Sequence, residues 1–190
     1  MNREESKKWL KEYFELYRTS LFETDVNEKL VELKEKFVAT HKAGKKVIFI
    51  GNGGSAAMAS HCAVDITKNA GVRCINFNAA DLITCFANDF GYDKCYAKAL
   101  EYYADAGDVV VLISCSGRSP NILRAAEYAK EKGFFVTTFT GFSADNPLTS
   151  QGNLNFCVNS RAYNVIEMTH HMWILSVCDL IIGKAEYSAS

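Results

Sequence analysis

The chain has 190 residues, of which 48% are hydrophobic and 23% charged, and its formal net charge is −1 at pH 7. This length suits one α/β domain with a full core and is short for two. Because no basic block occurs, we expect no nucleic-acid partner, and any anion site must be local. The first residues, MNREESKKWLKEYF, contain no signal-like apolar run, and no other run suggests a membrane span. A cytoplasmic protein without a membrane partner is therefore predicted.

Seven cysteines are scattered through the sequence without any CxxC pair. Their odd number and the charged N-terminus predict reduced thiols rather than a disulfide framework. Cys115 lies in a Gly/Ser-rich turn and is the one candidate nucleophile. No histidine lies near it in the sequence to activate it, so we expect a structural role, with a spatial neighbour left open.

The first 44 residues are predicted to form two amphipathic helices, an N-terminal extension that precedes the sheet. Apolar residues recur at helical spacing in both segments. They are Leu10, Tyr13, Phe14, Tyr17 and Leu21 in the first helix, and Val26, Leu30, Leu33 and Phe37 in the second. Asp25 and Glu28 predict a capping box at the start of the second helix. Two alternatives remain for the apolar faces: packing on their own domain, or contact with another subunit.

From Lys46 onward, strand-like and helix-like segments alternate. The predicted strands are Val47–Ile50, Cys74–Phe77, Val109–Ser114, Phe134–Phe139 and Asn155–Val158. The predicted helices are Ser55–Asn69, Ala79–Asn88, Lys94–Ala104, Pro120–Lys132 and Tyr163–Ile182. Several strands are apolar throughout, which is typical of a parallel sheet covered on both faces. The alternation predicts a doubly wound, three-layer α/β sandwich.

Two glycine- and serine-rich turns follow predicted strands: GNGGS at 51–55 and SCSGRS at 114–119. In such sheets, ligands bind at the carboxyl ends of the strands. The first turn fits the relaxed dinucleotide spacing G-x-G-x-x-A through Gly51, Gly53 and Ala56. That fingerprint needs an acid at the end of the second strand, and none occurs before Asp81. A dinucleotide is therefore disfavoured.

A single phosphate group fits the two turns better. The second turn places three serine hydroxyls beside the expected start of a helix, where free backbone N–H groups and the helix dipole favour an anion. The alternative is that these residues only form turns and N-caps. Because two such turns end strands of one sheet, we expect a bound phosphate. The candidate binding residues are Asn52, Gly53, Ser55, Ser114, Ser116 and Ser119.

The motifs GNGGS, SCSGRS and VIEMTHHMWILSVCDLI resemble the sugar isomerase (SIS) domain family, with a layout similar to that of phosphoheptose isomerases. The resemblance covers nearly the whole chain, including ANDFGY at 87–92, which adds Asp89 as a candidate substrate contact. It implies one SIS domain over residues 1–190 with a five-stranded parallel, flavodoxin-like sheet. It also implies a homotetramer with sites near subunit interfaces, and conversion of sedoheptulose 7-phosphate into a heptose 7-phosphate. The phosphate would be held by the residues that match the family motif, Ser55, Ser114, Ser116 and Ser119.

His61 and Asp65 lie four residues apart on the helix expected after the first turn, so both project from one face. A histidine and a carboxylate at this spacing share a metal ion, form a hydrogen-bonded pair, or are simply a solvated surface pair; the place of this pair on the helix after a phosphate-type turn keeps the functional alternatives open. In the resembled enzymes the position of His61 is also His and binds zinc, and the position of Asp65 is Glu, the catalytic base. Asp keeps the carboxylate on an arm shorter by one methylene. The resemblance thus implies acid/base chemistry for Asp65, with either zinc or no required cofactor.

The last helix departs from the family pattern. That pattern has Gln and His eight residues apart, where this chain has Ile166 and Ile174. Positions 166, 170 and 174 form one helical stripe, so we expect His170 to present its imidazole to the same cavity as the second catalytic residue. His171 is expected to point elsewhere, in a structural or interface role. Glu167 is either a matched acid or a surface charge.

These features lead to one leading hypothesis and one alternative. The leading hypothesis is a sugar-phosphate aldose–ketose isomerase that works through an enediol. The alternative is a SIS protein that binds a phosphosugar or a protein partner without chemistry. Arg118, where the family often has Asn, either binds the phosphate bidentately or indicates a different substrate. The candidate metal ligands are His61, Asp65 and His170.

Overall fold

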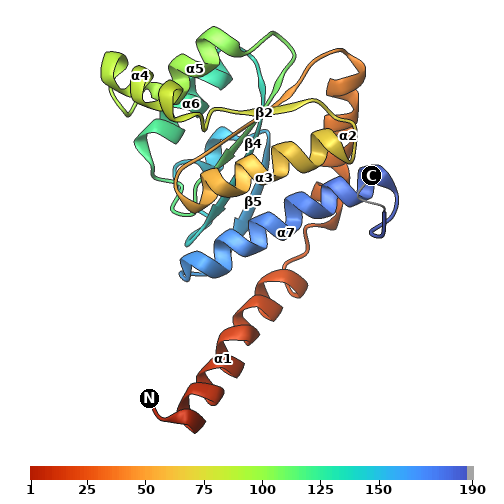
Figure 1. Cartoon of the computed structure of the whole chain (residues 1–190), viewed down its shortest axis with the longest axis vertical. Helices are drawn as coiled ribbons and strands as arrows, with labels where there is room; N and C mark the ends of the chain where they lie inside the picture. The colour runs from red at the N-terminus through yellow and green to blue at the C-terminus, as the bar shows by residue number, and fades with distance from the viewer. Residues whose placement is uncertain (188–190) are drawn as a thin grey trace.

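The computed structural model describes residues 1–187, so the last three residues of the predicted domain lie outside the described residues. One sheet of five parallel strands forms its centre (Figure 1). The strands are β1 (Val47–Gly51), β2 (Cys74–Asn76), β3 (Val109–Ile113), β4 (Phe135–Gly141) and β5 (Leu154–Val158). The helices are α1 (Arg3–Phe22), α2 (Asn27–Lys42), α3 (Gly54–Lys68), α4 (Ala80–Phe90), α5 (Cys95–Tyr103), α6 (Pro120–Glu131) and α7 (Tyr163–Ile182), with a short 3₁₀ helix at Thr149–Gln151.

The strand order is β2-β1-β3-β4-β5, which confirms the predicted flavodoxin-like sheet. β1 and β3 pair along their whole length, from Val47 opposite Val109 to Gly51 opposite Ile113. The connection that follows β1 leads to β2, on one side of β1 in the sheet. The connection that follows β3 leads to β4, on the opposite side. The sheet therefore has a topological switch point between β1 and β3, where ligands bind in open α/β sheets.

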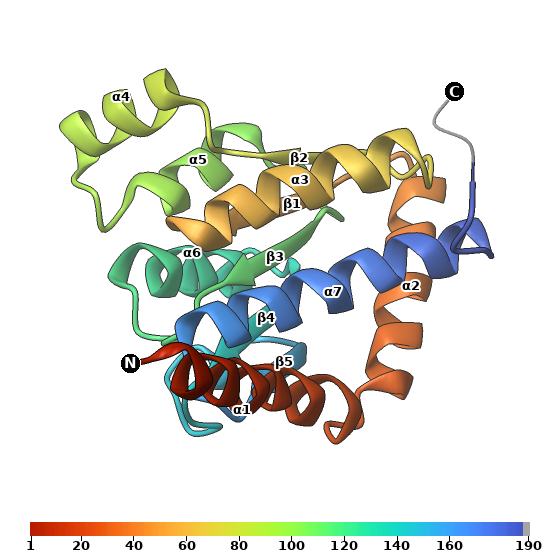
Figure 2. The ribbon, with the colours of Figure 1, turned by 60° about the horizontal axis from the view of Figure 1, so that its bottom comes forward.

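Two helical layers cover the sheet, which confirms the predicted three-layer sandwich (Figure 2). Alternate residues of β1 point to opposite faces, as the two-residue period of a strand requires. Phe49 packs with α2, α3 and α7, whereas Ile48 and Ile50 pack with α5 and α6. All five residues of β1 and of β3 are buried, which explains why their sequences are apolar throughout.

Helix α7 is the one helix among residues 1–187 that is long and apolar enough to cross a membrane, with a mean hydropathy of 1.4 over 18 residues. The prediction that no apolar run approaches that length is therefore wrong for this segment. In the structure, 44% of the window is buried, and α7 packs against α2, α3 and the sheet. Val165 and Val177 are fully buried in that core. Burial inside the protein accounts for the apolar residues on the inner face of this helix.

The two N-terminal helices differ in how they are covered. Helix α2 buries Leu33 and Phe37 completely in the core, whereas Ser20 is the only buried residue of α1. Helix α1 extends away from the body of the protein (Figure 1). Helix α2 begins after Val26 without a side-chain cap, so the predicted capping box of Asp25 and Glu28 is wrong. Its own domain therefore covers the apolar face of α2 and covers that of α1 only in part, since Leu10 and Phe14 stay exposed.

His170 lies in the core rather than at a cavity, and its side chain is 0% exposed. Its Nε2 donates a hydrogen bond to the carbonyl oxygen of Thr140 at 2.8 Å, and its ring packs against Phe139 and Trp173. Burial lowers the pKa of His170 to about 4, so the imidazole is neutral at pH 7. The prediction that His170 faces the ligand cavity is wrong, because its stripe of α7 faces the sheet.

We expect the buried His170 to make the protein less stable in acid. Its pKa in the folded state, about 4, lies below the ordinary value of 6.5, so the unfolded chain binds more protons between these values. The contribution of neutral His170 to the free energy of unfolding is fully present above pH 6.5, and it falls by about 3 kcal/mol as the pH drops toward 4. Urea unfolding of the native chain and of His170→Gln across this range measures it. His170→Gln should lose this part of the pH dependence of the free energy of unfolding. His41→Gln, at an exposed position, should keep it.

Candidate functional site

A small cavity of about 140 Å³ lies at the switch point, between the loops that follow β1 and β3. Both predicted turns contribute to it, which brings together Asn52, Ser55, Ser114, Ser116 and Ser119. We call it the serine cavity. Its remaining lining residues are Ile113, Cys115, Tyr163 and Glu167.

Three helices begin at the wall of the serine cavity. Ser55 lies in the first turn of α3, Ser119 is the N-cap position of α6, and Tyr163 is the first residue of α7. None of the three helices has a side-chain hydrogen bond at its N-cap. Their first N–H groups and the positive ends of their dipoles therefore favour a negative charge in the cavity.

Serine hydroxyls supply further donors for an anion. Ser55 and Ser114 are only 3% and 5% exposed, and the Oγ atoms of Ser114 and Ser119 lie 3.2 Å apart. The Ser116 hydroxyl accepts a hydrogen bond from the backbone N–H of Arg118 at 3.3 Å, which leaves its own proton free to donate. The hydroxyls and backbone groups together suit one phosphate-sized anion.

An amide pair joins the two loops. Asn52 and Asn121 exchange two side-chain hydrogen bonds, each of 2.9 Å, and the hydroxyl of Tyr92 donates to Asn52 Oδ1 at 3.0 Å. Asn121 is 1% exposed, so this contact is fixed inside the protein. Sequence reasoning found Asn52 but missed Asn121 and Tyr92. The only signal for Tyr92 was its place in ANDFGY.

Glu167 is the carboxylate of the serine cavity. It lies against the first turn of α3, because a Cβ on Gly54 would overlap its carboxylate, and its Oε1 lies 3.9 Å from Cys115 Sγ. The sequence left open whether Glu167 was a matched acid or a surface charge. Its position in the cavity favours a functional acid.

Cys115 is buried in the wall of the same cavity and is 5% exposed. Burial, together with the nearby Glu167 carboxylate, raises the pKa of its thiol to about 11. No imidazole contacts it among the described residues, and its near neighbour is the hydroxyl of Ser55 at 4.0 Å. A protonated thiol is a poor nucleophile, which agrees with the predicted structural role.

His61 and Asp65 form a cluster with His171, where α3 and α7 lie side by side (Figures 1 and 2). His61 Nδ1 lies 2.8 Å from His171 Nε2, and His61 Nε2 lies 3.4 Å from Asp65 Oδ2. Burial and the nearby His61 lower the pKa of His171. His171, which was expected to point elsewhere in a structural or interface role, contacts His61 and does not line the serine cavity.

The cluster and the serine cavity lie along one seam. His61 is six residues beyond Ser55 on α3, which is about 9 Å along the helix axis, and His171 is one turn beyond Glu167 on α7, about 6 Å. Because α3 and α7 run side by side, these residues form a row that starts at the cavity. An anion in the cavity would leave an attached carbon chain close to this row.

The predicted zinc site was tested against the donor geometry of the chain. No group of three or more His, Cys, Asp or Glu side chains within residues 1–187 is arranged to hold a metal ion. His170 is in the core, and both ring nitrogens of His61 are engaged by His171 and Asp65. The arrangement therefore does not form a metal site, and we derive no step through a metal.

Two other candidate residues lie outside the serine cavity. Asp89 is exposed on α4 and accepts a hydrogen bond from the side chain of Asn88 at 2.8 Å. Arg118 lines a neighbouring cavity instead, which shares Ser116 with the serine cavity. The structure thus brings the serines and Asn52 together, but not Asp89 or Arg118.

The sheet order and the switch-point cavity define an α/β protein with a cavity at converging helix N-termini, an arrangement that suits an anion. Comparison with known families gives the finer assignment. The chain belongs to the SIS domain family, whose family model matches residues 12–141. This confirms the family predicted from the glycine- and serine-rich motifs.

Several relatives bear the name phosphoheptose isomerase. The chain is 36% identical over 152 residues to that of Mycobacterium bovis, covering 76% of each chain. It is 30% identical over 181 residues to that of Sulfurimonas denitrificans, covering 92% of each. A solved structure of a phosphoheptose isomerase from Francisella tularensis superposes with a TM-score of 0.86 and 25% identity, over 97% of this chain and all of the other.

Proposed function

We propose that this protein is an aldose–ketose isomerase that acts on a sugar phosphate, with sedoheptulose 7-phosphate as the first candidate substrate. The observation that carries the proposal is the row of proton-exchanging side chains that begins at an anion-binding cavity. The names and similarity of the relatives support the phosphosugar class.

The phosphate group would occupy the serine cavity. Ser55, Ser114, Ser116 and Ser119 donate hydrogen bonds to its oxygens, and the N-termini of α3 and α6 offset its charge. This fixes one end of the substrate and leaves its carbon chain free to lie along the seam between α3 and α7. Positioning of this kind turns proton transfer into an intramolecular step.

Isomerisation moves one proton between adjacent carbons through an enediol, and it needs two groups that exchange protons. We assign these roles to Glu167 on α7 and to the Asp65–His61 pair on α3. One group takes the proton from carbon, while the other gives a proton to the carbonyl oxygen. In the second half of the reaction the first group gives its proton to the adjacent carbon, the former carbonyl carbon, and the second group takes a proton from the oxygen on the carbon that was deprotonated first, so each group returns to its starting state. His171, bonded to His61, orients that imidazole.

Deuterium exchange tests this proposal directly. In D₂O, the chain should introduce deuterium at the carbon next to the carbonyl of sedoheptulose 7-phosphate, which NMR detects even when the equilibrium is unfavourable. The matching aldose phosphate should appear with it. If ketose phosphates of five to seven carbons all remain unlabelled, the isomerase proposal is wrong.

The alternative, a receptor without chemistry, is favoured by one observation: the stripe where the family pattern has Gln and His is here core, with Ile166 and Ile174 fully buried. The two functions separate with paired variants. If Asp65→Asn and Glu167→Gln change nothing measurable while Ser116→Ala abolishes sugar-phosphate binding, the site is a receptor. Loss of exchange in the first two variants identifies an enzyme.

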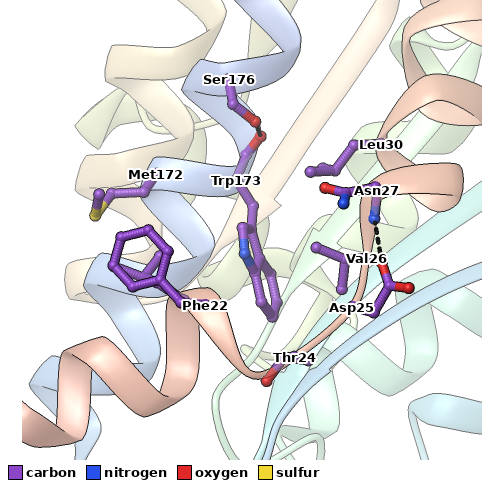
Figure 3. A pocket seen from close by; sticks show the side chains of 10 residues that line it. Phe22, Thr24, Asp25, Val26, Asn27, Leu30, Met172, Trp173 and Ser176 are labelled. Carbon is purple, nitrogen blue, oxygen red and sulfur yellow. Dashed lines mark hydrogen bonds between the residues drawn. The ribbon is translucent and has the colours of Figure 1, made fainter.

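We also propose a homo-oligomer, with four copies as the resemblance implies. Exposed apolar side chains on α1 support it, since Trp9, Leu10 and Phe14 are 48%, 45% and 62% exposed. Where α1 meets α2, a cavity of about 410 Å³ opens beside Phe22 and Met172, and these two side chains add to the exposed apolar surface (Figure 3). Sedimentation equilibrium should give a multiple of 21.1 kDa, and a monomer would refute this assembly.

A further inference from the structure

A second cavity, of about 260 Å³, adjoins the serine cavity and contains the two arginines of this region. Its lining residues are Ser116, Arg118, Phe142, Ser143, Asn146 and Arg161. We call it the arginine cavity. Because Ser116 lines both cavities, a ligand in one reaches the other without crossing the protein core.

Three loops at the carboxyl ends of β3, β4 and β5 build the arginine cavity. The N–H of Leu148 bonds to the carbonyl of Gly117 at 3.2 Å, which ties the β4 loop to the serine turn. The N–H of Phe142 bonds to the carbonyl of Ser160 at 3.0 Å, which ties it to the loop that carries Arg161. The cavity is therefore a feature of the fold, at the edge of the sheet where α/β proteins bind ligands.

The charges in the arginine cavity are not balanced. Arg161 is exposed, and its side chain has no hydrogen-bond or ion-pair partner in the part of the chain that the structure describes. The pKa of the Asp145 carboxyl is lowered, first by the hydrogen bond from Ser143 and to a smaller degree by the exposed Arg118 nearby. One carboxylate thus opposes two guanidinium groups, and a net positive charge remains. Guanidinium groups bind phosphate oxygens in pairs of parallel hydrogen bonds.

The wall of the arginine cavity also holds a strained residue. Phe142, with φ of 61°, is the only non-glycine residue with positive φ among residues 1–187. Its ring packs edge to face on Tyr163, which lines the serine cavity, with ring centroids 4.9 Å apart. Such backbone strain persists where the surrounding structure enforces it, and it clusters at ligand sites.

We propose that the arginine cavity binds a second phosphoryl group, held by Arg118 and Arg161 beside the phosphate in the serine cavity. The phosphoryl group is either free inorganic phosphate or the second phosphate of a sugar bisphosphate whose carbon chain runs from the serine cavity toward the arginine cavity instead of along the seam between α3 and α7. The proposal rests on the proposed function only in placing a sugar phosphate in the serine cavity. It does not require that the protein turn that sugar over.

Calorimetric titration of the intact chain tests the proposal with sedoheptulose 7-phosphate, sedoheptulose 1,7-bisphosphate and inorganic phosphate. The bisphosphate should bind about tenfold more tightly than the monophosphate if it is the source, because it adds charge-assisted hydrogen bonds. If free phosphate is the source, it should bind as a second equivalent to protein saturated with the monophosphate. Added salt should weaken either effect, the tighter binding of the bisphosphate or the binding of the second phosphate.

Variants decide whether the arginines are responsible. Arg161→Gln and Arg118→Gln should each remove most of the added affinity for the bisphosphate or the second phosphate. Both variants should leave the affinity for the monophosphate nearly unchanged. The matched control is Arg124→Gln, because Arg124 is exposed on α6 and pairs with Glu127 at 2.8 Å. The proposal is overturned if neither ligand shows a gain, or if the arginine variants weaken monophosphate and bisphosphate equally. Deuterium exchange, measured separately, shows whether the isomerase proposal fails by itself.

Discussion

Replacing Glu167 by glutamine is expected to lower kcat/KM for isomerisation by about 10²–10⁴-fold, the usual contribution of one acid/base group. Glutamine keeps the size and hydrogen bonding of the side chain but cannot take or return a proton. Inorganic phosphate should bind at least as well as before, because a negative charge has left the serine cavity. Steady-state kinetics and inhibition by phosphate measure the two effects.

A matched control separates this effect from a general loss of charge. Glu32→Gln removes a carboxylate from the exposed side of α2 and should leave kinetics unchanged. A Glu167→Gln protein that keeps its rate, with phosphate inhibition also unchanged, would remove Glu167 from the mechanism. Equal losses of activity and phosphate binding would instead indicate that Glu167 only maintains the shape of the cavity.

Gly117→Ala is expected to destabilise the protein by about 3 kcal/mol and to abolish sugar-phosphate binding. Gly117 has φ of 61°, and a Cβ there would overlap the amide of Asn146. Asn146 cannot move aside freely, because it is 3% exposed and bonds to Ser143 O at 2.7 Å and to Thr149 N at 3.1 Å. The serine turn must therefore shift, and Ser116 shifts with it.

Gly133→Ala is the matched control for this substitution. Gly133 has φ of 74°, and a Cβ there would have nothing within 4 Å. The cost should thus be that of left-handed backbone alone, about 1 kcal/mol, with ligand binding intact. Urea unfolding and ligand titration of both variants test the comparison. If the two variants behave alike, the contact between Gly117 and Asn146 has no part in holding the serine turn.

Much of the fold follows from local patterns in the sequence. The bounds predicted for the last helix agree with α7, Tyr163–Ile182, and each predicted strand lies within two residues of an observed one. Solid apolar runs predict strands buried on both faces, and glycine and serine between them predict turns. The serine cavity was predictable for the same reason, since the loops after β1 and β3 lie at one edge of any parallel sheet.

The last helix marks the limit of this reasoning. Neighbouring residues on a helix point about 100° apart. A side chain one position further along the helix can therefore leave the core and face the site. Counting along the helix placed His170 at the cavity, whereas the structure buries it in the core and leaves His171 beside His61. Glu167 carried no sequence signal beyond its match to the family, because a carboxylate on a helix is usually solvated.

The sequence by itself determined the parallel sheet, its helical layers and the glycine- and serine-rich turns after β1 and β3, because periodicity and turn chemistry are local. Tertiary structure alone decided which face of α7 meets α3, and therefore which histidine joins His61. It also decided that Arg118 and Arg161 line one separate cavity, since the loops after β3 and β5 are far apart in the chain. Contacts between distant segments depend on how the helices pack on the sheet, and no local pattern specifies that packing.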